Sequence, residues 1–138
     1  MKDNRAIVER FVRGMASNDI EAQEEVLADD IVEEYPQSGE VIRGKQNRRA
    51  ILQSYPGGTP QVAETKARPE SKITGADDEY TAVGQVTYPN GETWHVVSLF
   101  QLRDGKISRM TVYFGAPFEA PAWRAPYVET SLSGARAR

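Results

Sequence analysis

Residues 94–114, WHVVSLFQLRDGKISRMTVYF, decide the fold of this chain. Two apolar runs with alternating side chains flank Asp104-Gly105, and Asp-Gly between two such runs predicts a β-hairpin with a two-residue turn. One face of the hairpin is apolar, and a hairpin is not stable without a partner layer. We therefore expect helices to pack against this hairpin and to enclose a pocket.

The residues before the hairpin predict those helices. Ile7, Phe11 and Met15 recur every fourth residue after a capping Asp3, and Asp19 begins a second, shorter helix. A third helix is expected over residues 45–55, with Ala50, Ile51 and Tyr55 inward and Arg48-Arg49 on a solvated face. Strands are expected over residues 31–35, 80–88 and 61–74. Pro69 interrupts the last of these, which indicates an edge strand or a bulge. Helices first and an antiparallel sheet afterwards predict an α+β fold.

The composition excludes several classes of site. The 138 residues include no cysteine and one histidine, so disulfides, thiolate metal sites and sites of several imidazoles are excluded, and we expect no cofactor. The net charge is −3 and no basic run occurs, so we expect no nucleic-acid partner. No stretch approaches the roughly 20 apolar residues of a membrane span, and the first residues do not resemble a signal peptide. We expect a cytoplasmic protein with no membrane partner, one domain over 1–130 and a flexible tail over 131–138.

The order of these elements resembles the SnoaL-like members of the nuclear transport factor 2-like superfamily. The resemblance covers roughly residues 7–127 and rests on several short segments taken together. These are Asn18-Asp19, Leu27-Ala-Asp-Asp-Ile31, Tyr35-Pro-Gln-Ser-Gly-Glu40, Ile42-Arg-Gly44 and Asp104-Gly-Lys-Ile107. It implies a cone in which a strongly bent sheet wraps the N-terminal helices around an internal cavity. It also implies that many members form dimers through the outer sheet face.

The resemblance argues against ketosteroid isomerisation. In that enzyme the base, the oxyanion tyrosine and a protonated aspartate fall on positions that match Tyr35, Phe11 and Ser98 here. All three groups are replaced, and Phe11 can donate no hydrogen bond to an oxyanion. We therefore reject ketosteroid isomerase activity. The Asp-Arg-Asp cluster of limonene epoxide hydrolase has no equivalent that we can place.

The same matching of positions predicts which side chains form the cavity wall. If Ser98 faces inward, strand alternation turns Trp94, Val96, Phe100 and Leu102 inward as well. Met110, Val112 and Phe114 follow on the last strand, and Ile31, Glu33 and Tyr35 on the first. The ligand-binding residues expected from the register, the first helix and the C-terminal aromatic segment are Phe11, Tyr35, Trp94, Ser98, Phe100, Val112, Phe114 and Trp123.

Three residues are candidates for acid/base roles, and each has a structural alternative. Glu33 in an apolar cavity would have a raised pKa, but strand twist could instead leave it in solvent. Tyr35 could donate to a ligand carbonyl or be a core tyrosine. His95 is the one imidazole of the sequence, yet an inward Trp94 turns it outward. The candidate catalytic set is Glu33, Tyr35 and His95.

Two functions of different class stay open. One is a cofactor-independent isomerase, cyclase or hydrolase acting on a small hydrophobic molecule, carbonyl-bearing or polycyclic. The other is a non-catalytic binding or scaffold domain. We also expect a homodimer through the outer sheet face, because Val97 and Leu99 are apolar and point outward. Phe118, Trp123 and Tyr127 are expected to be docked, as a lid, a dimer clasp or ordinary packing.

Overall fold

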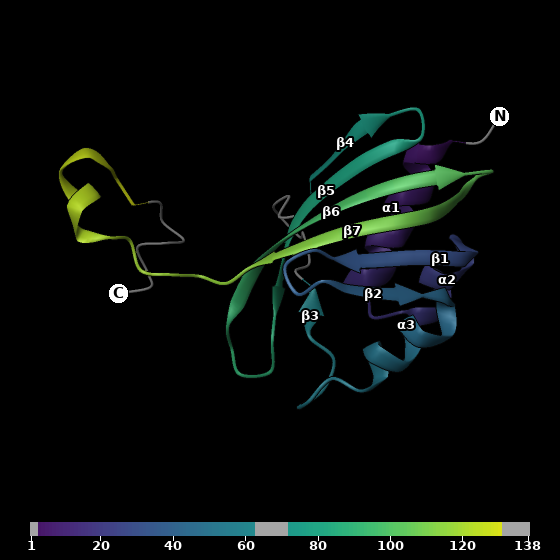
Figure 1. Ribbon diagram of the computed structural model, residues 1–138, viewed down its shortest axis with the longest axis horizontal. Coiled ribbons are helices and arrows are strands. Elements are labelled where there is room, and N and C mark those ends of the chain that lie inside the picture. Colours follow the sequence, from purple (N-terminus) through teal and green to yellow (C-terminus); the bar gives the residue numbers. More distant parts are fainter. Residues whose placement is uncertain (1–2, 63–71, 131–138) are drawn as a thin grey trace.

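The structure is a computed structural model that describes residues 3–62 and 72–130. Helices α1 (Asn4–Ala16), α2 (Ile20–Glu25) and α3 (Gly44–Gln53) accompany a bent sheet. Its strands are β1 (Leu27–Tyr35), β2 (Glu40–Arg43), β3 (Gln61–Val62), β4 (Lys72–Ala76), β5 (Glu79–Thr87), β6 (Thr93–Arg103) and β7 (Lys106–Gly115), and a 3₁₀ helix, η1 (Ala122–Tyr127), follows. Figure 1 shows α1 crossing behind the sheet. The predicted α+β cone is confirmed.

The two predicted helix caps are present. The Asp3 side chain accepts a hydrogen bond from the backbone N–H of Ala6 at 3.2 Å, and Asp19 accepts one from Ala22 at 3.0 Å. Both carboxylates satisfy a backbone donor that the first helical turn leaves free, and their charge suits the positive end of the helix dipole. These caps fix where α1 and α2 begin.

The sheet order is β2-β1-β7-β6-β5-β3, with β4 also paired to β5. The β1–β7 pair is parallel and the other pairs are antiparallel. The predicted hairpin is β6–β7: Arg103 pairs with Lys106, and Asp104 and Gly105 both have positive φ, 53° and 75°. Both turn residues are thus left-handed, as a type I′ turn requires. An extra residue at Ser108 then shifts the register, so Ile107 and Met110 both face the core.

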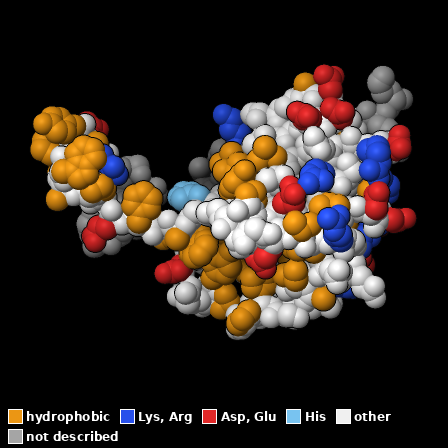
Figure 2. Space-filling model, in the orientation of Figure 1, with side chains coloured by type: hydrophobic (Ala, Val, Ile, Leu, Met, Phe, Trp, Pro, Cys, Tyr) orange, Lys and Arg blue, Asp and Glu red, His pale blue; other side chains and the backbone are white. Residues whose placement is uncertain are grey.

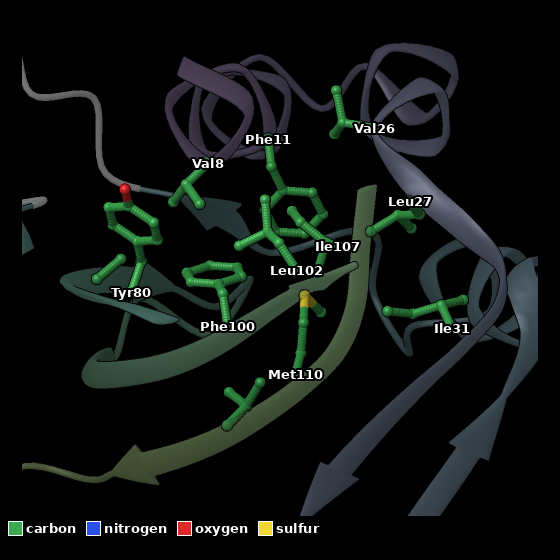
Figure 3. Close-up of a cluster of buried hydrophobic side chains, with 12 residues drawn as sticks. Val8, Phe11, Val26, Leu27, Ile31, Tyr80, Phe100, Leu102, Ile107 and Met110 are labelled. Atoms are coloured by element: carbon green, nitrogen blue, oxygen red, sulfur yellow. The ribbon is translucent and has the colours of Figure 1, made fainter. Parts of the chain in front are cut away.

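The core lies between α1 and the inner face of the sheet. Figure 3 shows Val8 and Phe11 of α1 pointing at Phe100 and Met110 of the sheet. The Phe11 and Phe100 rings meet edge to face, with centroids 5.7 Å apart. Both rings also line the cavity under the sheet, so this packing forms part of the wall of the candidate site.

Several predicted boundaries are wrong. The first strand starts at Leu27 instead of residue 31, and Glu40–Arg43 is a strand where only a turn was expected. The third helix ends at Gln53, and it buries Arg48 while Ala50 and Ile51 are exposed. Pro69 and residues 131–138 lie outside the described residues.

The prediction of a docked aromatic tail is also wrong for a single copy of the chain. Phe118, Trp123 and Tyr127 are 83%, 72% and 83% exposed. Figure 1 shows the segment after β7 running away from the sheet before it turns into the 3₁₀ helix. Strand β7 ends at Gly115, and the extended backbone at Pro121 does not turn the following chain back over the core. Within the described ranges, no helix has the length and apolarity to cross a membrane.

Candidate functional site

A cavity of about 170 Å³ lies between the helices and the inner face of the sheet. Its sheet wall is mainly apolar and comprises Ala82, Val96, Ser98, Phe100, Val112 and Phe114, while Phe11, Val12 and Met15 contribute from α1. The strand pairing explains why these residues share a face. Ser98 lies between Ala82 on β5 and Val112 on β7 in one cross-strand row, and residues two positions along each strand face the same way. The result is an apolar chamber with a few polar groups, the usual form of a small-molecule site.

The chamber holds a buried ion pair. Glu33 on β1 and Arg48 on α3 are 6% and 4% exposed, and Arg48 Nε donates to Glu33 Oε1 at 3.1 Å. Glu33 faces inward because it lies in the cross-strand row with Met110 and Phe100, both of which are core residues. Of the two alternatives for Glu33, the inward one is the one that the structure shows. A buried carboxylate needs a counter-charge, and Arg48 supplies it.

Arg48 is fixed on every side. Its Nη1 donates to Gln23 Oε1 at 2.8 Å, and its Nη2 lies 3.2 Å from Met15 Sδ. The guanidinium also lies over the Phe11 ring, 5.1 Å from the centroid. Gln23 is itself buried and donates from Nε2 to the backbone carbonyl of Gly14 at 3.0 Å. The guanidinium is therefore preorganised, and its position depends on α1 and α2 as well as on α3.

Gly14 makes this arrangement possible. A Cβ at position 14 would lie 3.0 Å from Gln23 Cγ and 3.3 Å from the Gln23 backbone nitrogen. Those distances are too short for ordinary van der Waals contact. The absence of a side chain at residue 14 lets Gln23 approach the α1 backbone and orient its amide toward Arg48.

The environment of Glu33 has two opposing effects on the pKa of its carboxyl group. Burial raises the pKa of Glu33 above its usual value of 4.5, while the charge and hydrogen bond of Arg48 and a hydrogen bond from Tyr35 oppose that rise. The pKa of Tyr35 is strongly raised, first by burial and then by the Glu33 charge, so its hydroxyl keeps its proton. A carboxylate offers about four acceptor sites, so Glu33 keeps acceptor capacity beyond Arg48 and Tyr35. Chemically, Glu33 can accept a proton and Tyr35 can donate a hydrogen bond.

Three aromatic residues border the more exposed end of the cavity. Tyr55 and Tyr88 are half-buried and line it, with ring centroids 6.4 Å apart. Trp94 packs edge to face on Tyr88 at 5.2 Å and donates from Nε1 to Glu92 at 3.0 Å. Burial raises the pKa values of both tyrosines, so their hydroxyls are neutral donors. The entrance is consequently apolar with two hydroxyl groups.

The structure brings together most, but not all, of the residues that the sequence singled out. Glu33, Phe11, Tyr35, Ser98, Phe100, Val112 and Phe114 line the cavity. Trp94 supports Tyr88 and is not part of the lining. His95 is exposed and lies on the outward side of β6, as the register predicted, so it has no contact with the cavity. Trp123 lies on the exposed tail, outside the cavity of its own chain.

Two members of the polar cluster were missed from the sequence. Arg48 was assigned to a solvated face, and Gln23 was not considered. The spacing of Arg48, Leu52 and Tyr55 is i, i+4, i+7, which is that of one helix face, and all three line the cavity. A buried Glu33 also needs a positively charged partner. The spacing of this helix face could therefore have identified Arg48 as that partner. Among the residues that the structure describes, no group of three or more His, Cys, Asp or Glu side chains could hold a metal ion.

Comparison with known proteins gives the family. The model of the SnoaL-like domain matches residues 8–110. The chain belongs to the SnoaL-like family, within the NTF2-like superfamily. A solved NTF2-like protein of unknown function from Burkholderia xenovorans LB400 is 31% identical, with 93% of this chain and 94% of that chain covered and a TM-score of 0.75.

Two further solved structures share the fold of this SnoaL-like chain. A putative ketosteroid isomerase from Kribbella flavida is 24% identical, with a TM-score of 0.78 over 93% of this chain and 89% of that one. TerC, co-crystallised with polyporic acid, is 22% identical, with a TM-score of 0.64 over 80% of this chain and 90% of that one. A comparison with curated protein sequences finds no match.

Proposed function

We propose that this SnoaL-like protein binds a small hydrophobic molecule in the cavity and acts on it as a cofactor-independent isomerase, cyclase or hydrolase. The observation that carries the proposal is the position of Glu33: a buried carboxylate with a raised pKa that lines an apolar chamber. Perturbed acids in concave apolar sites are the usual general bases and acids of enzymes. TerC, which was crystallised with polyporic acid, supports ligand binding by this fold.

Glu33 is the proposed base and Tyr35 the proposed hydrogen-bond donor. Glu33 would remove a proton from the bound molecule, and the neutral Tyr35 hydroxyl would stabilise the reacting group or the carboxylate. Arg48 is a positioning residue, because it fixes one oxygen of Glu33 and leaves the other available. The Ser98 side chain, on the sheet wall, makes no side-chain hydrogen bond among the described residues, so its hydroxyl can orient a polar substituent of the ligand. His95 is left out of this proposal.

The size of the chamber limits the ligand. The cavity of about 170 Å³ is close to the roughly 150 Å³ apolar cavity that holds benzene in an engineered protein. Of the two ligand classes expected from the sequence, a carbonyl-bearing molecule of one or two rings fits this volume better than a larger polycyclic compound. A larger molecule would extend past Tyr55 and Tyr88 into solvent.

The alternative is a non-catalytic binding domain, and one observation favours it. Glu33 and Arg48 neutralise each other, and Gln23, Met15 and Phe11 hold the arginine, so the cluster could serve only to fill and order the core. Catalysis needs Glu33 to exchange a proton with a ligand, whereas a structural pair does not.

An untargeted experiment separates these functions. The wild type and the Glu33→Gln variant would be purified from the same host and incubated with a hydrophobic extract of that host. Mass spectrometry would then identify the compounds left in the extract and those retained by each protein. We expect Glu33→Gln to retain one compound unchanged and the wild type to convert that compound to a product. Recovery of that compound unchanged from both proteins would support the binding domain. A Tyr113→Phe variant, altered on the outer face, is the matched control and should behave as wild type.

We also propose a homodimer through the outer face of β5–β7. Val83, Leu99 and Tyr113 are 43%, 41% and 42% exposed there, and Val83, Val97 and Tyr113 lie in one cross-strand row. Static light scattering at micromolar concentration tests this state, and a monomer mass would contradict it. The cytoplasmic location suggested by the composition stays a prediction.

A further inference from the structure

The C-terminal segment carries the largest exposed apolar side chains among the described residues. Phe118, Trp123 and Tyr127 are between 72% and 83% exposed, although Pro121 and the 3₁₀ helix give the segment a defined shape. Arg124 lies over the Trp123 ring at 5.4 Å, so the segment also has internal structure. Three ordered aromatic side chains in water are unfavourable at about 25 cal/mol for each Å² of apolar area.

A second exposed apolar surface lies on the same chain. Val83, Val97, Leu99 and Tyr113 form a strip on the outer face of β5–β7, which α1 does not cover. Figure 2 shows hydrophobic side chains gathered on the body and on the projecting segment. Tyr113 lies two residues before the end of β7, so this outer strip borders the base of the aromatic segment.

We propose that the aromatic segment of one copy docks on the outer strip of a second copy, and that the partner's segment does the same in return. The inference rests on the homodimer proposed above and goes beyond it. The segment leaves β7 in the direction of the strand and away from its own strip (Figure 1), so docking on its own strip would require a reversal of the chain. In a two-fold dimer this docking occurs twice, because an isologous interface uses the same surface on both copies.

The area supports a second copy as the occupant. A large aromatic side chain buries about 150–250 Å², so the six aromatics of two segments hide on the order of 1,000 Å². The two strips add further area, and the sum falls in the range of roughly 1,200–2,000 Å² that stable interfaces bury. Aromatic anchors on an apolar surface are also the usual centre of binding energy.

Cross-linking between differently labelled copies tests the contact, because the chain has no cysteine of its own. Ala122→Cys on the segment and Thr111→Cys, beside Leu99 on the outer face, leave the proposed anchors intact. Mixing an isotope-labelled Ala122→Cys protein with unlabelled Thr111→Cys under mild oxidation should give mixed disulfides at least about tenfold faster than mixing it with Val41→Cys. Val41 is the matched control, since it is 47% exposed on β2, away from the strip. Equal rates with both partners would overturn the proposal.

Sedimentation equilibrium supplies the second measurement. Replacing Phe118, Trp123 and Tyr127 together by serine should raise the dimer dissociation constant on the order of 100-fold and leave the circular dichroism spectrum unchanged. Val41→Ser should leave the constant as it is. A dimer that persists with unchanged affinity in the triple variant would refute docking of the segment and leave the dimer standing. A wild-type monomer at every concentration would refute both, and ligand retention by the cavity is measured independently of either.

Discussion

Replacing Arg48 by Met should destabilise the protein strongly, and by an amount that depends on pH. The substitution keeps the apolar stem of the side chain and removes the counter-charge and hydrogen-bond donor of Glu33. Removing one partner of a buried pair typically costs about 3–5 kcal/mol, because the other charge is left uncompensated. The same variant loses the contact with Gln23, which adds to the cost.

The pH dependence follows from the pKa of Glu33. That pKa is raised above 4.5 in the folded protein, and Arg48 is one of the two groups that hold the rise back. Without Arg48 the pKa moves higher still. Between the unfolded and the folded pKa the native state binds a proton that the unfolded state does not, so stability falls as pH rises through this window. The slope is about 1.4 kcal/mol for each pH unit inside this window, so the penalty should be larger near pH 8 than near pH 5.

Urea unfolding across that pH range measures the effect. The double variant Arg48→Met, Glu33→Gln should lose this pH dependence and recover stability, because replacing both members of a buried pair is often neutral. Arg49→Met is the control. Arg49 is next to Arg48 in the sequence but is more exposed, and it pairs with Glu24 and Glu21, so its replacement should reduce stability far less. If Arg48→Met shows the same stability loss at low and high pH, or if Glu33→Gln fails to rescue it, the buried ion-pair argument is wrong.

Three further predictions concern the supports of the cluster. Gly14→Ala should destabilise the protein by about 1–3 kcal/mol in thermal or urea unfolding despite better helix propensity, because the new Cβ overlaps Gln23; a stabilised variant would contradict this. Tyr35→Phe should raise the pKa of Glu33, since the lost hydrogen bond favours the charged form; carbon-13 NMR titration of the Glu33 carboxyl measures it, and an unchanged midpoint would refute the contact. Asp19→Ala should cost about 1 kcal/mol in urea unfolding and Asp19→Asn much less, and equal losses would rule out capping as the reason.

Local chemistry made the hairpin and the sheet wall predictable. Asp104-Gly105 allows one tight turn, and alternation then decides which side chains of β6 and β7 face inward. The family resemblance placed Ser98 inward, and alternation then predicted Phe100 inward and His95 outward. The orientation of Glu33 could not be decided from the sequence, because one strand position does not show whether a counter-charge lies on the other side of the cavity.

The parts that sequence reasoning missed depend on contacts between distant segments. An arginine in a polar helix normally faces water, and only the approach of α3 to β1 gives Arg48 a reason to be buried. The prediction for the aromatic tail was wrong for a related reason. Its composition predicted burial, but composition does not say in which molecule the burial takes place, and one copy of the chain leaves it exposed.

The burial of Glu33 connects the stability of this protein to its proposed chemistry. Each unit by which its pKa exceeds the unfolded value lowers stability at higher pH by about 1.4 kcal/mol and raises the proton affinity of the carboxylate tenfold. Arg48 limits both effects, and Gln23, Met15 and Phe11 prevent it from moving away. A ligand that enters the chamber would further desolvate Glu33, while Arg48, held by these contacts, would keep its opposing charge in place. Glu33 should therefore be a stronger base with a ligand bound than in the empty cavity, as an enzyme requires and a purely structural ion pair does not.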